Sequence, residues 1–242
     1  SSVGEVSAFW DILYREIGRT NAVIERSEDI TYVDPAKKAA RVSEAKFLRA
    51  LSYFFLVQTW GDVPMPLTET IAPSKAVVRV PSAQVYTQIL KDLTEAEAAL
   101  PVTATDYGRV TKGAAQFLLA RVYLTRGWNY KNSLGGSAAD FKSALDYADK
   151  VITAYPLVAQ YNTLFPKRDT NPLKQYTGAQ NDRNSEVVFT VQYNADALTN
   201  AMEVAYPSTA NREPGNYYHS IFPGNGERVG NAGRTSDYNR HL

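Results

Sequence analysis

The 242-residue chain contains no cysteine. Disulfide bonds, thiolate catalysis and cysteine-based zinc sites are therefore excluded. Histidine is almost as scarce: the only two, His219 and His241, lie near the end of the chain with no acidic cluster beside them in sequence. We therefore expect no metal site.

Long apolar runs are also missing, because no stretch approaches the roughly 18–20 residues that a membrane-spanning helix needs. No signal peptide opens the chain, so the sequence indicates either a cytosolic protein or one whose start has been removed. An excess of charge is lacking too: 26 Lys and Arg face 25 Asp and Glu, for a net charge of +1. This balance gives no electrostatic reason to expect a nucleic-acid partner or attraction to an anionic membrane surface.

Catalytic motifs are mostly absent. There is no nucleophile elbow and no phosphate-binding loop, and Gly224-x-Gly226-x-x-x-Gly230 is not the dinucleotide fingerprint. Paired carboxylates for glycoside hydrolysis need only be close in space, so that alternative stays open. The helical acidic residues are interpreted as solvated polar faces: Glu44, Asp92, Glu95, Glu97, Asp146 and Asp149. We therefore expect no enzyme and no cofactor.

Helical periodicity dominates the first two thirds of the chain. Apolar residues at helical spacing predict helices over about 8–26, 35–60, 82–100, 112–126 and 138–155. Asp34 and Pro35 form a clear helix start, and Gly61 and Gly127 are expected to end helices. Asn21 lies on the apolar stripe of the first helix. If it is buried it must be hydrogen-bonded, so we expect it to tie that helix to its neighbour.

Two of these helices share a pattern. Leu48-x-Ala50-x-x-Tyr53 matches Leu118-x-Ala120-x-x-Tyr123. Each is followed by a second helix that stops at a proline, Pro101 or Pro156. A small alanine lets helices approach and an aromatic side chain fills the groove, as in tetratricopeptide-type helix pairs. The pattern predicts a mostly α fold of tetratricopeptide-like hairpin repeats, with the two tyrosines packed at equivalent sites.

The chain changes character after Pro156. Ser185–Tyr193 alternates apolar and polar residues and predicts one short β-strand. Residues 194–242 are rich in Asn, Gly, Pro and Tyr and predict an extended loop region. We therefore divide the chain into a helical scaffold, 1–160, and a loop-rich segment, 161–242, that is incomplete at its C-terminal end.

Aromatic residues beside amides form two candidate groups. Trp60 and Trp128-Asn129-Tyr130 lie at helix ends, and we interpret them as packing. Asn216-Tyr217-Tyr218 lies in the late loop region. An exposed ring stacks on the apolar face of a sugar and an amide bonds its hydroxyls, so Asn216, Tyr217 and Tyr218 are our candidate carbohydrate-binding residues.

Several fragments resemble the SusD/RagB family. They are Glu44–Phe54, Trp60-Gly61-Asp62-Val63-Pro64, Thr111–Ala115 with Leu119–Leu124, and Asn184–Phe189, in the family's order. The resemblance implies a non-catalytic, lipid-anchored protein on the outer face of the outer membrane of a Gram-negative bacterium. It also implies that the protein binds oligosaccharides and delivers them to a SusC-like TonB-dependent transporter.

The sequence departs from the family at both ends. The signal peptide, the lipidated cysteine, the early loops and the later helices are absent, and those early loops carry part of the family's ligand site. The main alternative is a helical-repeat protein–protein adaptor that holds a peptide in a concave groove. The long 61–80 connection and the Tyr- and Asn-rich tail favour glycan capture, because tandem adaptors keep short, regular turns.

Overall fold

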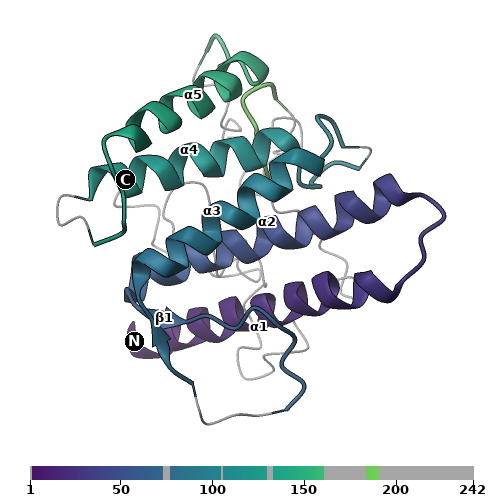
Figure 1. Ribbon diagram of the computed structural model, residues 1–242. Coiled ribbons are helices and arrows are strands. Elements are labelled where there is room, and N and C mark those ends of the chain that lie inside the picture. Colours follow the sequence, from purple (N-terminus) through teal and green to yellow (C-terminus); the bar gives the residue numbers. More distant parts are fainter. Residues whose placement is uncertain (1, 73–76, 105, 130–132, 161–183, 191–242) are drawn as a thin grey trace, which may run out of the picture. The chain divides into compact units, whose positions relative to one another are not determined.

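The computed structural model describes residues 2–72, 77–104, 106–129, 133–160 and 184–190. Within these residues it contains five α-helices and a two-stranded ladder. The elements are α1 (Ser2–Asp29), α2 (Pro35–Trp60), β1 (Val63–Pro64), β2 (Arg79–Val80), α3 (Ser82–Ala99), α4 (Lys112–Trp128) and α5 (Ala139–Ala154) (Figure 1). Residues up to Thr190 form one compact unit, and a second unit begins at Val191, outside the described residues. The mostly α, hairpin-repeat fold predicted from the sequence is confirmed.

Helix α1 lies along α2 and buries one face against it (Figure 1). Phe9, Leu13 and Ile17 are buried at helical spacing, as the apolar stripe predicts. Asn21, on the same stripe, is buried as well. Helix α1 therefore contributes an apolar face, and its buried residues also include the polar Thr20, Asn21 and Ser27.

Helix α2 begins and ends where its capping residues predict. The Asp34 carboxylate accepts hydrogen bonds from the backbone N–H groups of Ala36 and Lys37, at 3.0 and 3.3 Å, and Pro35 occupies the first helical position. At the other end Gly61 has φ of 72°, and its N–H donates to the Val57 carbonyl. A side chain disfavours that backbone conformation, so glycine at this position ends the helix cleanly.

The helices after α1 form two antiparallel hairpins, α2/α3 and α4/α5, as predicted. In the first hairpin Lys46 pairs with Glu95 and Arg49 with Asp92, so the residue numbers run in opposite directions. In the second, Arg126 pairs with Asp140. The Tyr123 and Tyr147 rings stack there with a centroid distance of 5.9 Å and an interplanar angle of 10°. Helix α4 also packs on α3, which joins the hairpins into one layered stack (Figure 1).

Gly127 does not end α4, contrary to the prediction, because the helix continues to Trp128. The glycine has a different role there. A Cβ atom on Gly127 would lie 3.2 Å from the Cβ of Asp140, at the start of α5. The missing side chain thus allows α5 to approach close enough for Arg126 and Asp140 to pair.

The strand predicted at 185–193 is not formed over residues 185–190. Asn184–Glu186 makes a turn, in which the Val187 N–H donates to the Asn184 carbonyl, and the next residues have no regular structure. One apolar side chain of this segment contacts a helix. The Phe189 ring meets Phe47 of α2 edge-on, with a centroid distance of 5.4 Å. Residues 191–193 lie outside the described residues.

The two hairpins differ in how much of their surface is covered. Tyr53 is fully buried, whereas its equivalent Tyr123 is only half-buried. The two tyrosines therefore occupy the same position in their helices, as predicted, but they are not equally buried. On the second helix of each pair, Leu90 is buried and its equivalent Leu145 is exposed. The second hairpin therefore presents apolar side chains at positions that the first hairpin buries.

Candidate functional site

The candidate carbohydrate-binding residues Asn216, Tyr217 and Tyr218 lie outside the described residues. Of the helix-end tryptophans, Trp60 packs as expected: its ring lies 5.0 Å from Trp10 in an edge-on contact. Trp128 does not fit that interpretation, because 76% of it is exposed and its ring contact among the described residues is an edge-on approach to Phe141 at 6.5 Å. The end of α4 thus presents a large aromatic surface to solvent.

The connection between α2 and α3, residues 61–81, is closed at its base by the β1–β2 ladder. Val63 pairs with Val80 and Pro64 with Arg79 in antiparallel register. The Asp62 carboxylate accepts hydrogen bonds from the N–H and hydroxyl of Ser82, at 2.8 and 2.7 Å, and these bonds lower the pKa of Asp62. An ionised carboxylate at the N-terminus of α3 also complements the helix dipole, so the connection and the helix stabilise each other.

Side chains of α1 and α2 hold the same connection by its carbonyl groups. The hydroxyls of Tyr14 and Tyr53 donate to the carbonyls of Pro64 and Pro66, at 2.7 and 2.6 Å. Burial raises the pKa of both phenols, so both remain protonated donors across the physiological range. The Asn21 amide donates to the Pro66 and Thr68 carbonyls, both at 3.0 Å. The Asn21 side-chain oxygen also accepts a hydrogen bond from Arg49 of α2, at 2.9 Å, which confirms the expectation that Asn21 ties its helix to a neighbouring helix.

A buried ion pair lies beneath this connection. The Arg49 guanidinium makes a bidentate pair with the Asp92 carboxylate, at 2.8 and 2.7 Å, and also donates to the Asn21 side-chain oxygen and the Leu67 carbonyl. The side chains of Arg49 and Asp92 are only 6% and 1% exposed. The sequence interpretation of Asp92 as part of a solvated helix face was wrong, since its face of α3 is turned toward α2. The pair links three helices to the connection.

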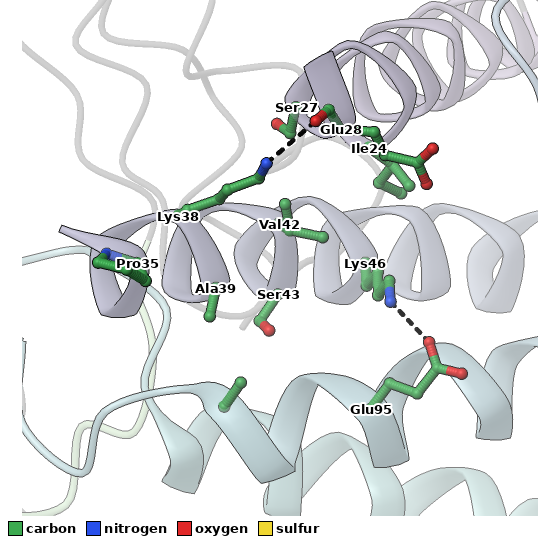
Figure 2. Close-up of a pocket in the computed structure, with 11 residues that line it drawn as sticks. Ile24, Ser27, Glu28, Pro35, Lys38, Ala39, Val42, Ser43, Lys46 and Glu95 are labelled. Atoms are coloured by element: carbon green, nitrogen blue, oxygen red, sulfur yellow. Dashed lines mark hydrogen bonds and ion pairs between the residues drawn. The ribbon is translucent and has the colours of Figure 1, made fainter. Parts of the chain in front are cut away.

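A groove of about 630 Å³ opens between the end of α1, the start of α2 and the end of α3. Figure 2 shows Ile24, Ala39 and Val42 between charged groups at the rim, including the Lys46–Glu95 ion pair. Lys38 donates to the Glu28 and Ile30 carbonyls at the end of α1. Among the described residues no aromatic side chain lines this groove, so they offer no ring surface there on which a sugar could stack.

Two other classes of site find no support in the described part of the chain. It brings together no group of three or more His, Cys, Asp or Glu side chains that could hold a metal ion. Within the same residues, every helix is too short or too polar to cross a bilayer. The side chains of Tyr14, Asn21 and Tyr53 that contact residues 61–81 position the backbone of this connection.

Residues 2–124 match a protein family described as "Starch-binding associating with outer membrane". The chain belongs to this SusD-like family. SusD-like protein P2 of Formosa agariphila is 32% identical over 179 residues, which is 71% of this chain and 33% of that protein. The starch-binding protein SusD of Bacteroides thetaiotaomicron is 30% identical over 62% of this chain and 25% of its own length. The chain thus spans about a third or less of these SusD-like relatives.

Solved SusD-like structures share the helical fold. A crystal structure with a xylogluco-oligosaccharide superimposes with a TM-score of 0.59 at 30% identity, over 66% of this chain and 32% of that one. A laminarin-binding SusD-like protein gives a TM-score of 0.52 at 32% identity, over 64% of this chain and 31% of that one. The SusD-like family has a carbohydrate-binding role without catalysis.

Proposed function

We propose that this chain is part of a non-catalytic glycan-binding protein of the bacterial cell surface. The observation that carries the proposal is the family match over residues 2–124, together with the oligosaccharides named for two structural neighbours. The structure supports a rigid scaffold for such a role. The connection at 61–81 is held by four side chains of α1 and α2, so loops supported by these helices have a fixed base.

We assign the glycan contact to Asn216, Tyr217 and Tyr218. Tyrosine supplies a stacking face and a hydroxyl, and a loop lets both stand exposed. The aromatic residues of the scaffold core, such as Phe54, are occupied by packing. Affinity is expected between roughly micromolar and millimolar, or about −8 to −4 kcal/mol, because a polar ligand exchanges bonds to water for bonds to protein.

The test is a glycan array on the full-length protein, followed by calorimetric titration of the best ligand. Tyr217→Ala and Tyr218→Ala should each weaken binding, with the circular dichroism spectrum unchanged. Tyr107→Ala is the matched control, since Tyr107 is an exposed loop tyrosine elsewhere in the chain. Unaltered affinity in both variants removes these tyrosines from the site. An array without any bound glycan contradicts the proposed function itself.

We further propose that the protein is lipid-anchored in the outer membrane and passes its ligand to a SusC-like TonB-dependent transporter. The description of the family supports the outer-membrane association, and the helical hairpins offer a stable surface for a large partner. The transporter should co-purify with the full-length protein from native membranes in mild detergent. Recovery of the protein only as a free monomer counts against this partnership.

A further inference from the structure

One face of α4 carries a line of exposed side chains. Phe117, Arg121, Leu124 and Trp128 follow one another at spacings of four, three and four residues, which places them on the same side of the helix. Phe117, Leu124 and Trp128 are 43, 50 and 76% exposed. Phe117 and Trp128, at the two ends of the line, are eleven positions apart, or roughly 16 Å along the helix axis. Two aromatic rings therefore stand at its ends, with a cation between them.

Among the described residues, the Arg121 guanidinium contacts aromatic rings and no carboxylate. Its central carbon lies 5.7 Å from the ring centroid of Phe54 and 5.9 Å from that of Phe117. Among the described residues no acidic side chain forms an ion pair with Arg121. Arg49 and Arg126, in contrast, each make a bidentate pair with an aspartate. The guanidinium of Arg121 lies against these rings, and no acidic side chain of the described part of the chain compensates its charge.

The rest of α4 strengthens the positive character of this line. The sequence of the helix contains Lys112, Arg121 and Arg126 but neither Asp nor Glu. Asp140 of α5 compensates Arg126 alone. An anionic group that approached Arg121 would meet no repulsion from α4 itself, and the line has the charge that complements an anion.

Neutral hydrogen-bonding groups lie one helical turn from Arg121. The Gln58 amide of α2 approaches the Thr125 hydroxyl at 3.5 Å, and that hydroxyl donates to the Arg121 carbonyl at 2.8 Å. Both Gln58 and Arg121 are exposed. Apolar rings, an amide, a hydroxyl and a guanidinium thus alternate along one surface built from α2 and α4.

We propose that this surface binds glycan and that the sugar at Arg121 is a uronate. Its carboxylate would accept two parallel N–H···O bonds from the planar guanidinium, whose geometry fits a carboxylate. The flanking sugars would stack on Phe117 and Trp128. This inference rests on the proposed glycan-binding function and adds to it the chemical class of the ligand, an acidic oligosaccharide longer than one ring.

The test compares acidic and neutral chains of equal length on the full-length protein. Oligogalacturonate, a sulfated oligosaccharide that carries no carboxylate, and the neutral laminari-oligosaccharide are titrated against the wild type, Arg121→Gln and Arg121→Lys. We expect the wild type to prefer oligogalacturonate. Arg121→Gln should lose on the order of tenfold in affinity for that ligand, the usual effect of one charge-assisted contact, and should be unchanged toward the neutral chain. Arg121→Lys should keep part of the preference, because it keeps the charge and loses the planar fork.

Lys91→Gln is the matched control, since Lys91 is an exposed cation on α3 and its loss changes the net charge equally. This control should leave the preference intact. Binding of the neutral chain without preference for the acidic one, or a preference that survives Arg121→Gln, overturns the inference while the proposed function stands. Preference for the sulfated chain over the uronate overturns the assignment of a carboxylate. Failure of all three ligands to bind overturns the inference, and the glycan array on the full-length protein tests the proposed function separately.

Discussion

Replacing Arg49 by methionine removes the centre of the buried polar network while keeping most of the side-chain volume. Four hydrogen bonds disappear: two to the Asp92 carboxylate, one to the Asn21 amide oxygen and one to the Leu67 carbonyl. The Asp92 carboxylate would then remain buried with the Gln88 amide, at 3.0 Å, as its remaining hydrogen-bond donor among the described contacts. Breaking a buried pair in this way costs about 3–5 kcal/mol, because the remaining charge is desolvated without compensation.

The loss should be visible in urea unfolding of the full-length protein. With a slope of about 2 kcal/mol per molar urea, Arg49→Met would lower the midpoint of the transition that reports on this unit by about 2 M. The double variant Arg49→Met/Asp92→Leu should recover much of this loss, since it removes both charges from the interior. Lys142→Met is the control: the Lys142–Asp146 pair is exposed on α5, and its loss should change stability by less than about 0.5 kcal/mol.

Two results would refute the reasoning. A loss below about 1 kcal/mol for Arg49→Met would mean that water reaches the carboxylate, and so that the pair is not buried. If the double variant loses as much unfolding free energy as the two single variants together, Arg49 and Asp92 act independently. Either result would also remove the argument that the connection at 61–81 depends on this pair.

Two further predictions concern the second hairpin. Tyr123→Ala should lower the free energy of unfolding by about 1–2 kcal/mol, because Tyr123 is half-buried and its ring stacks on Tyr147. Removal of a fully buried ring such as Tyr53 should cost more, roughly 3–5 kcal/mol. Equal losses in urea unfolding of the two Ala variants would contradict this prediction. The hydrogen bonds from Arg126 hold the pKa of Asp140 below its usual 3.8. The carboxylate therefore adds stability that is complete above about pH 5 and is lost as the pH falls through the lowered pKa. The urea midpoint of Asp140→Asn should be lower than that of the wild type at neutral pH, and it should fall less steeply as the pH drops below about 4. Parallel plots of midpoint against pH for the two proteins would show that the Arg126–Asp140 pair contributes nothing to stability.

The helical hairpins could be predicted from the sequence because their signals are local. Asp34-Pro35 starts a helix and Gly61 ends it through contacts within a few residues, and the helical stripe of α1 needs only one helix to be recognised. The repeated Leu-x-Ala-x-x-Tyr pattern then indicates which helices correspond. These features do not depend on the rest of the fold.

The buried ion pair could not be predicted in the same way. Arg49 and Asp92 are 43 residues apart, and periodicity does not reveal which polar face of a helix will meet a neighbour. One signal was present: Arg49 stands among apolar residues in the most continuously apolar stretch of α2, where a charge needs a partner. Gly127 was misinterpreted for a related reason. Its missing side chain accommodates another helix, and a single sequence does not distinguish such a glycine from a helix end.

The polar residues of the core follow from the irregular connection that the core supports. The described residues of this connection, 61–72 and 77–81, have no regular secondary structure outside β1 and β2, so most of their carbonyl groups cannot be satisfied by a helix or a sheet. Tyr14 and Asn21 of α1, with Arg49 and Tyr53 of α2, supply donors to four of these carbonyls. Asp92 in turn compensates the charge that Arg49 brings into the interior. A purely apolar core would pack the same helices but would leave those carbonyls unpaired, at about 1–3 kcal/mol for each buried group. The network therefore allows an irregular segment to pack against a helical-repeat scaffold, because it pairs the carbonyl groups of that segment. Substitution of its donors should displace the segment before the helices unfold.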